Sequence, residues 1–367
     1  MTDPRWPDSW APYMTWAKHH AKAGIDLTGS NLLPCTLDEL PGAREAMQLY
    51  GRNDDGWPPL VEAIAVRYGV GPERVVTATG ASGANFLALS ALLRPGDTLL
   101  AEWPGYDPHI GTARLLGARV KTFDRGWHRS FALDPDAVEA ALTPDTRAIV
   151  LTNLHNPSGV YAEPEALARV GELARSVDAK VIVDEVYLDA LTGVERSPAA
   201  TRADVFVSTN SLTKSYGLAG IRVGWLLADP DVVERALRIR DVVDGVGSIP
   251  SETIGTLAFE RLDHLLERAR RVLEPGARLF RSFVESRSEL AWVPPLGGSV
   301  AFPRLNGVDD AGPFVDLAMR EFDLGVTPGR FFGEPAHFRV AVAGRFDVLE
   351  RGLDALGRAL SRWSGGA

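Results

Sequence analysis

Short apolar runs alternate with stretches of helical periodicity through the middle of the chain. The runs are rich in Val, Ile and Leu, and they cover residues 75–79, 98–101, 120–123, 148–152, 181–184, 205–208 and 223–228. Runs this short, separated by helix-like spacers, are typical of strands buried on both faces of a mostly parallel sheet. Ligands of such sheets gather at the carboxyl ends of the strands. The pattern therefore predicts an α/β fold with its site at that edge.

The flanking regions carry further predicted elements. Helices are expected over residues 60–68, 251–272 and 275–287, and a last strand over 337–343. Near the start of the chain, aromatic residues are spaced partly like the apolar face of a helix, namely Trp6, Trp10, Tyr13 and Trp16. Such a segment is an arm packed on the body or on a partner subunit, or alternatively a substrate lid.

Composition narrows the class of protein. The chain has 367 residues, of which 45% are apolar and 24% charged, as in an ordinary globular enzyme with a large and a smaller domain. A net charge of -9 argues against nucleic acid as a partner. Cys35 is the only cysteine, which excludes an intrachain disulfide and a cysteine-based metal site. The sequence shows no leader or membrane-spanning run, so we expect a cytoplasmic protein without a membrane partner.

Lys214 is the first candidate for chemistry. It is one of five lysines and lies in a largely uncharged segment with Gly217, Gly220 and Gly224. A lysine that attacks carbonyls must be held in place and partly desolvated, so that its amine can lose a proton. The alternative is a surface lysine in a loop before a strand.

Polar residues at other predicted strand ends add to this candidate. Residues 79–86 form a turn of small residues that opens a helix, which suits an anion but matches neither a dinucleotide nor a P-loop signature. Asp184 ends a buried run and could be a magnesium ligand, but no Gly-Lys-Ser/Thr accompanies it. We therefore expect no metal site.

The order and spacing of these pieces resemble the aspartate aminotransferase superfamily of pyridoxal 5'-phosphate (PLP) enzymes, fold type I. Ser211 precedes Lys214 by three positions and Arg222 follows it by eight, as in the family's lysine motif. The Asn-Pro-Ser-Gly loop at Asn156, which alone would be a common turn, and the Asp-x-x-Tyr of residues 184–187 also match. The resemblance covers roughly residues 26–360.

The resemblance implies a role for each matching residue. Lys214 would carry PLP as a Schiff base, the internal aldimine, and act as the catalytic base. The phosphate would be held by Ala81, Ser82, Ser211, Arg222 and, from the other subunit, Tyr50. Tyr50 could instead be packed at a loop edge.

The ring and the substrate have their own matching residues. Tyr106 would stack on the pyridine ring, Asn156 and Tyr187 would hold its phenolate oxygen, and Asp184 would pair with its nitrogen. His109 matches a histidine found near that aspartate, although a structural role is its commoner use. The substrate carboxylate would meet Arg339, with Asn31 or its neighbours lining the pocket. Arg330 could meet an anionic side chain or face solvent.

The family's fold is a three-layer sandwich around a mostly parallel mixed sheet, plus a smaller α+β domain built from the N-terminal arm and the C-terminal segment. The expected division is residues 1–45 as arm and small-domain segment, 46–265 as large domain and 266–367 as C-terminal small domain. Family members build their sites at a dimer interface, so a homodimer with shared active sites is expected.

The reaction expected from the resemblance is transfer of an amino group between an amino acid and a 2-oxo acid. Residues 245–250 contain no arginine, which disfavours strict dicarboxylate specificity. The alternative is a PLP-dependent lyase or cyclase in specialised metabolism, because the fold does not decide the reaction. A PLP-binding DNA regulator is disfavoured, since residues 1–30 are too short for a DNA-binding segment.

Overall fold

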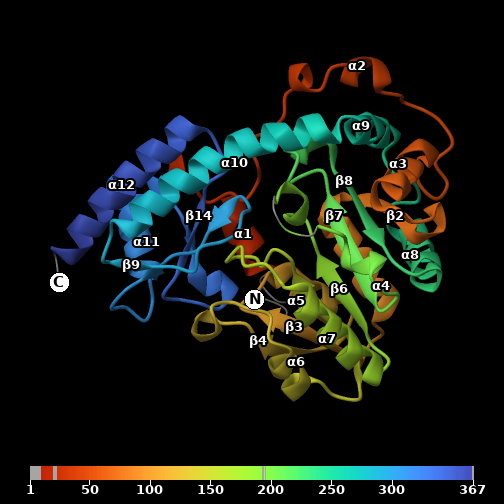
Figure 1. The fold of residues 1–367 in the computed structure, drawn as a ribbon, viewed down its shortest axis with the longest axis horizontal. Coiled ribbons are helices and arrows are strands. Elements are labelled where there is room, and N and C mark those ends of the chain that lie inside the picture. Colours follow the sequence, from red (N-terminus) through yellow and green to blue (C-terminus); the bar gives the residue numbers. More distant parts are fainter. Residues whose placement is uncertain (1–9, 20–22, 192–193, 195, 366–367) are drawn as a thin grey trace, which may run out of the picture.

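The computed structural model describes residues 10–19, 23–191, 194 and 196–365. Its central sheet consists of β2 (Val75–Thr79), β3 (Thr98–Trp103), β4 (Arg119–Asp124), β5 (Thr146–Thr152), β6 (Lys180–Asp184), β7 (Phe206–Ser211) and β8 (Val223–Leu227). The strand order is β2-β8-β7-β6-β5-β3-β4 (Figure 1). β8 pairs antiparallel with both β2 and β7, whereas the other neighbours in the sheet are parallel. The predicted mostly parallel mixed sheet is confirmed.

Helices cover both faces of this sheet. The α-helices of the described residues are α1 (Pro12–His19), α2 (Ala43–Ala46), α3 (Pro58–Tyr68), α4 (Gly80–Leu92), α5 (Asp107–Leu115), α6 (Pro135–Ala141), α7 (Pro164–Ser176), α8 (Pro230–Val243), α9 (Ile249–Glu260), α10 (Leu262–Glu285), α11 (Gly312–Phe322) and α12 (Phe346–Ser364). Apolar side chains of α4, α5 and α8 pack on one face of the sheet. Those of α6 and α7 pack on the opposite face, and α3 and α9 cover the end near β2 and β8.

The continuous apolar runs follow from this burial on two sides. In β6, Ile182 packs toward α4 and α8, while Val181 and Val183 pack toward α7. All three side chains are fully buried, so no position of the strand needs to be polar until its end. The parallel register then aligns Thr152 with Asp184, and Asp184 with Thr209, at the carboxyl edge.

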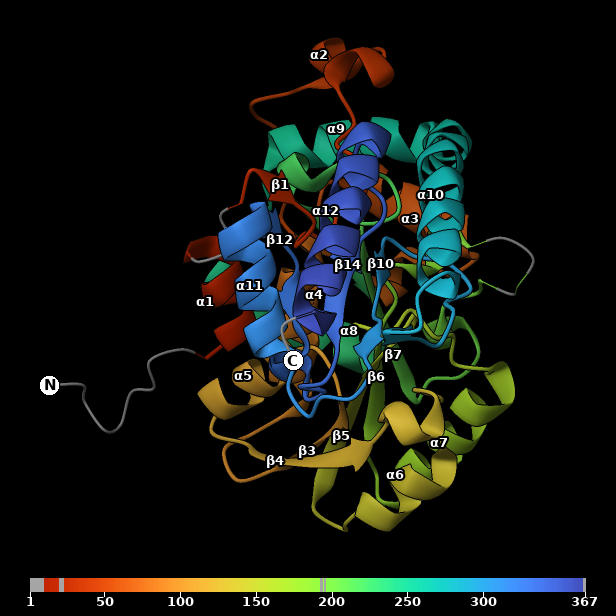
Figure 2. The same cartoon turned by 90° about the vertical axis from the view of Figure 1, so that its left-hand side faces the viewer.

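A second apolar core lies beside the sheet and is formed by the C-terminal part of the chain. It includes α11, α12, the second half of α10 and short strands (Figure 2). These strands are β9 (Leu290–Ala291), β10 (Val300–Ala301), β11 (Arg304–Leu305), β12 (Leu324–Gly325), β13 (Thr327–Pro328) and β14 (Phe338–Ala341). β1 (Ile25–Asp26) pairs in parallel with β12 and so ties the N-terminal segment to this core. That pairing supports the predicted domain division, which stays a prediction.

After the sheet, the sequence predicted two helices with a boundary near residue 273. The structure has that boundary at Arg261 instead, and α10 continues through Pro275. A proline removes only one helical hydrogen bond, and here Leu273, Gly276 and Phe280 are buried around it, so packing of the apolar face maintains the helix. As a result α10 runs as one rod from the sheet to the second core (Figure 1). None of the described helices is both long enough and apolar enough to cross a membrane.

Gly224 in β8 provides a test of this packing. A Cβ there would overlap the backbone of Gly80, where α4 begins, whereas a Cβ at Gly220 would meet nothing within 4 Å. We expect Gly224→Ala to lower the free energy of unfolding by about 1 to 3 kcal/mol, because the two backbones would have to separate. Gly220→Ala should leave stability nearly unchanged. Denaturant melts of both variants check this, and equal stabilities would contradict it.

Candidate active site

A cavity of about 550 Å³ opens at the carboxyl edge of the sheet. Its walls come from the ends of β5, β6 and β7, the start of α4, the segment after β1, and helix α1. The predicted site residues that line it are Asn31, Ala81, Ser82, Tyr106, Asn156, Asp184, Tyr187, Ser211, Lys214 and Arg222. Residues separated by almost two hundred positions in the sequence therefore meet in one space.

Lys214 lies just after β7, and its amine is held by two side chains from the N-terminal segment. Nζ donates to Ser30 Oγ at 2.8 Å and to Asn31 Oδ1 at 2.6 Å. Desolvation, with a smaller contribution from the positive charges of Arg339 and Arg222, lowers the pKa of Lys214 to about 7 against the opposing effect of Asp184. Near neutral pH a large fraction of this lysine is therefore an uncharged amine that can act as nucleophile or base.

Asp184 ends β6 and faces the cavity with a fixed carboxylate. Its Oδ2 accepts a hydrogen bond from Asn85 Nδ2 at 2.7 Å, and His109 Nε2 lies 3.4 Å from the same oxygen. Asn85 is oriented in turn by Thr209, whose hydroxyl donates to Asn85 Oδ1 at 2.6 Å. A buried acid held in this way is suited to pair with a protonated nitrogen in the cavity.

The opposite end of the cavity has the donors of an anion site. Ser82 lies in the first turn of α4, where backbone N–H groups and the helix dipole favour negative charge. Arg222 crosses this turn so closely that a Cβ at Gly80 would overlap its guanidinium. Arg222 also adopts a left-handed conformation, with φ of 52°, which is rare for a residue with a side chain. Its hydrogen bonds to Thr79 O and Ala219 O are long, at 3.5 and 3.3 Å.

Tyr106 and Tyr187 supply aromatic surfaces to the same cavity. Burial raises the pKa of Tyr187 to about 12, so its hydroxyl stays protonated and can donate a hydrogen bond. Burial also raises the pKa of Tyr106 well above its usual value. Lys214 Nζ lies 6.0 Å from the centre of the Tyr187 ring.

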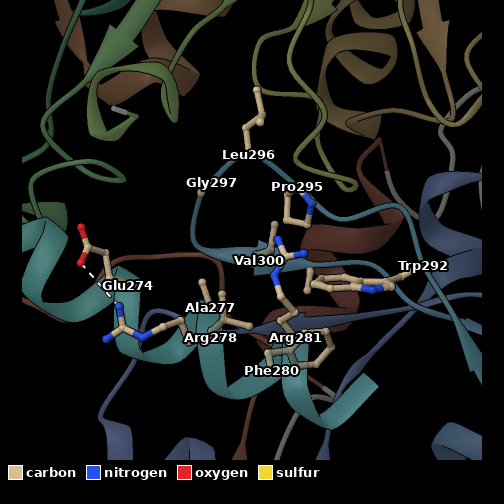
Figure 3. A pocket seen from close by; sticks show the side chains of 13 residues that line it. Glu274, Ala277, Arg278, Phe280, Arg281, Trp292, Pro295, Leu296, Gly297 and Val300 are labelled. Carbon is tan, nitrogen blue, oxygen red and sulfur yellow. Dashed lines mark ion pairs between the residues drawn. The ribbon is translucent and has the colours of Figure 1, made fainter. Parts of the chain in front are cut away.

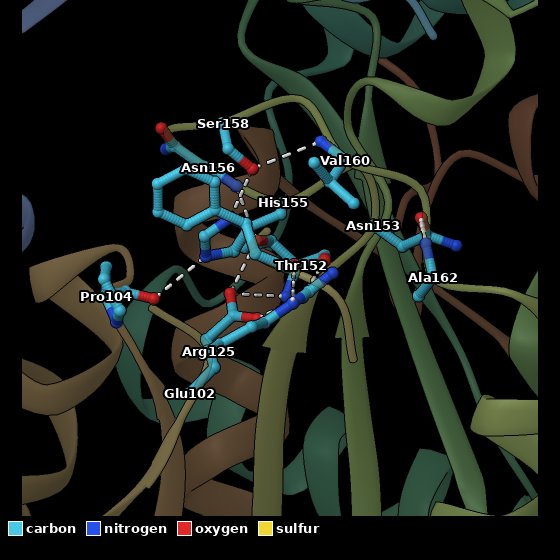
Figure 4. A network of polar contacts seen from close by, with 11 residues as sticks. Glu102, Pro104, Arg125, Thr152, Asn153, His155, Asn156, Ser158, Val160 and Ala162 are labelled. Atoms are coloured by element: carbon cyan, nitrogen blue, oxygen red, sulfur yellow. Dashed lines mark hydrogen bonds and ion pairs between the residues drawn. The ribbon is translucent and has the colours of Figure 1, made fainter. Parts of the chain in front are cut away.

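Asn156 is positioned by a fully buried ion pair behind it (Figure 4). Its backbone N–H donates to Thr152 Oγ1 at 2.8 Å, and Thr152 donates from both its hydroxyl (2.5 Å) and its N–H (2.8 Å) to Glu102 Oε1. Glu102 Oε2 pairs with Arg125 Nη1 at 2.5 Å, and that nitrogen also donates to Thr152 O at 3.1 Å. Three atoms of Thr152 are thus held, which leaves the Asn156 loop little freedom.

Arg339 on β14 differs from the other buried arginines. Arg125, Arg240 and Arg268 each lie within 4 Å of a glutamate, at Glu102, Glu252 and Glu39. Among the described residues Arg339 has only neutral partners, which are Asn156 Oδ1 (3.2 Å), Thr28 O (3.1 Å) and the Tyr13 hydroxyl. Its Nε is buried without a hydrogen bond. A desolvated cation without a carboxylate partner is suited to receive an anionic ligand.

The family model for class I and II aminotransferases matches residues 26–356. The chain belongs to the class I and II aminotransferase family. Capreomycidine synthase from Streptomyces vinaceus is 31% identical over 372 residues, covering 95% of this chain and 93% of that protein. A histidinol-phosphate aminotransferase from Sphingopyxis alaskensis is 33% identical over 261 residues, covering 65% and 66%.

Two solved structures show the same architecture over nearly the whole chain. A PLP-dependent aminotransferase from Streptococcus suis has a TM-score of 0.90 at 25% identity, covering 97% of this chain and 98% of that one. The PLP-dependent cyclase OrfR has a TM-score of 0.87 at 26% identity, covering 98% and 99%. Both the family and the fold type I architecture expected from the sequence are confirmed.

PLP is the cofactor of this family, and the cavity fits it. The family cofactor needs an amine, an acid for a ring nitrogen and a dianion site, and Lys214, Asp184 and Arg222 provide these groups around one space. Arg222 passes so close to Gly80 that no side chain fits at position 80, which keeps its guanidinium beside the backbone at the start of α4. No group of three or more His, Cys, Asp or Glu among the described residues is placed to hold a metal ion.

Tyr50 and Arg330 lie away from this cavity. Tyr50 is 86% exposed and does not line the cavity of its own chain, so a role toward another subunit stays a prediction. Arg330 lines a separate surface hollow near Trp103 rather than this cavity. Of the predicted aromatic arm, Trp6 lies outside the described residues, whereas Tyr13 lies in the cavity wall.

The sequence indicated no role for Asn85, Thr152 and Thr209, and it placed Tyr13 and Ser30 only within the aromatic arm and among the neighbours of Asn31. Thr152 lies shortly before Asn156 in the sequence, so that proximity could have identified it. The contact of Asn85 with Asp184 spans 99 positions and has no local signal. It becomes visible only when α4 is placed on the sheet.

A second cavity of about 220 Å³ lies between α10 and β10 (Figure 3). Phe280, Trp292 and Val300 form an apolar floor, and the Arg281 guanidinium lies 5.6 Å from the centre of the Trp292 ring. None of the predicted site residues lines it. It is therefore separate from the chemistry of the larger cavity.

The lowered pKa of Lys214 predicts how the cofactor-free protein captures PLP. Because the neutral amine is the nucleophile, the capture rate should rise as the pH passes about 7 and level off one or two units above. An ordinary lysine would continue to gain reactivity up to about pH 10. Stopped-flow absorbance measures the rate, and Lys214→Ala should show no capture at any pH. A rate that keeps rising to pH 10 would be incompatible with the desolvated amine.

The clamp on Asn156 predicts a contrast between two Thr152 variants. Thr152→Val removes the hydroxyl that receives the Asn156 N–H, which leaves a buried donor unpaired and should lower the free energy of unfolding by about 1 to 3 kcal/mol. We also expect its affinity for PLP to fall about tenfold, which corresponds to 1.4 kcal/mol. Thr152→Ser retains the hydroxyl and is the matched control. The affinities are measured by titrating the cofactor-free variants with PLP and following their fluorescence. Equal affinities of Thr152→Val and Thr152→Ser would refute the clamp.

Proposed function

We propose that this protein is a PLP-dependent aminotransferase that moves an amino group between an amino acid and a 2-oxo acid. The observation that carries the proposal is the placement of the Lys214 amine, desolvated to a pKa of about 7, in the cavity shared by Asp184 and Arg222. Arg339, the buried cation without a carboxylate partner, lies behind Asn156 at the edge of the same space. This arrangement combines a base, a cofactor site and a carboxylate site.

The bound cofactor supplies an electron sink for the pair of electrons left when a bond at the amino acid's Cα breaks. Asp184, which Asn85 and His109 support, would pair with the positive charge on the ring nitrogen. Ser82, Ser211 and Arg222 would bind the phosphate, together with Ala81. Tyr106 would hold the ring by stacking.

Lys214 moves the proton in this mechanism. When free and neutral, its amine would take the proton from the amino acid's Cα and would hold it for return in the later step of the transfer. Its pKa near 7 suits both directions of transfer, since a base works best when its pKa is close to the working pH. Asn31 and Ser30, which hold the amine, line the path to the substrate.

Asn156 and Tyr187 would together hold the phenolate oxygen of the ring. Both line the cavity, and the high pKa of Tyr187 keeps its hydroxyl available as a donor. Asn156 also touches Arg339 at 3.2 Å, so one side chain joins the cofactor site and the carboxylate site.

A homodimer with shared sites is part of the proposal. Exposed apolar side chains occur at Met47, Leu49 and Tyr50 on one segment and at Val242 and Val246 on another. The two segments are adjacent, because residues 48 and 53 are hydrogen-bonded to residues 253 and 247. A second copy covering this surface would bury them and bring Tyr50 toward a neighbouring site. The single cysteine and the composition support a cytoplasmic location.

A cyclase is the second candidate, and a specific observation favours it. The match to capreomycidine synthase covers 95% of this chain, and the cyclase OrfR has the same architecture as this chain. Cyclisation would use the same Lys214, Asp184 and Arg339, because it also begins with removal of a proton from a bound amino acid. The absence of arginine in residues 245–250 disfavours strict dicarboxylate substrates for either reaction.

The dependence on an amino acceptor separates the two reactions. The holoenzyme is incubated with a panel of amino acids, with and without 2-oxo acids, and the products are followed by mass spectrometry. An aminotransferase should make only a stoichiometric amount of 2-oxo acid without an acceptor and turn over many times with one. Multiple turnovers without an acceptor would replace transamination by cyclisation or elimination. Lys214→Ala should lose activity by about 10²- to 10⁴-fold in either case, since it removes the base.

A further inference from the structure

Arg339, the proposed carboxylate site, does not itself line the cavity. Its side chain is only 1% exposed, and Tyr13 and Asn156, which do line the cavity, cover it. Tyr13 lies on helix α1, in the segment that the sequence indicated as an aromatic arm or a substrate lid. A substrate carboxylate that reaches Arg339 from the cavity must therefore pass next to the Tyr13 side chain.

The contact between Tyr13 and Arg339 involves both the ring and the hydroxyl. The Tyr13 hydroxyl accepts a hydrogen bond from Arg339 Nη2. The guanidinium carbon lies 4.8 Å from the centre of the Tyr13 ring and 4.8 Å from that of Phe332. The two aromatic rings fix the guanidinium, and the phenol oxygen marks one end of its hydrogen-bonding fork.

Tyr13 is held in this position from outside the C-terminal core. Its backbone N–H, at the start of α1, donates to Asp107 Oδ2 at 2.8 Å, and this contact is buried. Its ring packs edge-on against Tyr106, with centroids 6.5 Å apart. The start of α5 and the predicted ring-stacking residue therefore both position Tyr13.

We propose that Tyr13 is a substrate-binding residue that shares the amino acid's α-carboxylate with Arg339. Without substrate its hydroxyl accepts from Nη2. With substrate bound, the carboxylate takes the guanidinium fork and the hydroxyl rotates to donate to a carboxylate oxygen. The hydroxyl has one donor and two acceptor positions, so it can serve in both states without moving its ring. This inference rests on the proposed function.

A consequence is that helix α1 contributes to substrate discrimination. A ligand with a carboxylate gains a charge-assisted hydrogen bond from Tyr13, whereas an amine that lacks the carboxylate gains nothing from it. Removing the hydroxyl should therefore weaken the binding of amino acids and leave the binding of amines unchanged.

Two probes that differ only in the carboxylate test this. 2-Methylalanine has no proton on Cα, and tert-butylamine, which also has none, carries a methyl group in place of the carboxylate. Their dissociation constants for the holoenzyme are measured by titration of the cofactor absorbance. Tyr13→Phe keeps the ring and its packing, and it should weaken the binding of 2-methylalanine by at least about tenfold, as for a lost hydrogen bond to a charged group. Its affinity for tert-butylamine should stay within about twofold.

Thr15→Val provides the matched control. It removes a hydroxyl from the same helix, but Thr15 is exposed, so neither dissociation constant should change.

Kinetics with the best amino acid of the panel should show a higher KM for Tyr13→Phe with kcat much less affected.

The outcomes separate this inference from the proposed function. If the wild-type enzyme does not distinguish the two probes, the carboxylate site at Arg339 itself is wrong and the proposed function fails with it. If the wild type prefers 2-methylalanine and Tyr13→Phe keeps the same preference, only the role of Tyr13 is overturned. Equal weakening of both probes, or tighter binding of 2-methylalanine, would also overturn it.

Discussion

The amine of Lys214, held by Ser30 and Asn31, is the contact on which the site depends. The lysine follows a strand of the central sheet, whereas its two partners belong to a segment that packs with the C-terminal core. Neither part of the chain can place this amine alone. Its desolvation, which gives it a neutral form near physiological pH, follows from bringing the two parts together.

The positive charges at the site are not balanced by the protein alone, and bound anions would balance them. Lys214 and Arg222 line the cavity with the acid Asp184, and Arg339 lies behind Asn156; the two arginines add to desolvation in lowering the pKa of the lysine. Phosphate at one end and carboxylate at the other would balance the two arginines. The contrast with Arg125, whose charge Glu102 already balances, separates a structural cation from one kept for binding.

The sequence indicated those parts of the site that strand ends supply. Asp184 and Asn156 follow buried apolar runs, and a parallel sheet places such ends together, so their convergence was predictable. Contacts between helices and distant strands were not. Tyr13 reaches Arg339 across 326 positions and Asn85 reaches Asp184 across 99, and no local pattern encodes either. The boundary between the two predicted helices was also placed wrongly, because burial of the neighbours of Pro275 keeps α10 continuous there. The role of Tyr50 depends on a second copy and stays a prediction.

The N-terminal segment is tied to the C-terminal core along its length. Leu27 O accepts from Ala341 N, Ser30 O accepts from Ser299 Oγ, and Leu33 N donates to Ala343 O. Ser30 and Asn31 must therefore travel with that core. If the core rotates against the sheet, the lysine gains or loses two acceptors at once, and its proton affinity changes with the angle between the core and the sheet. Opening and closing of the protein would then act as a mechanical control on the basicity of its own catalytic amine.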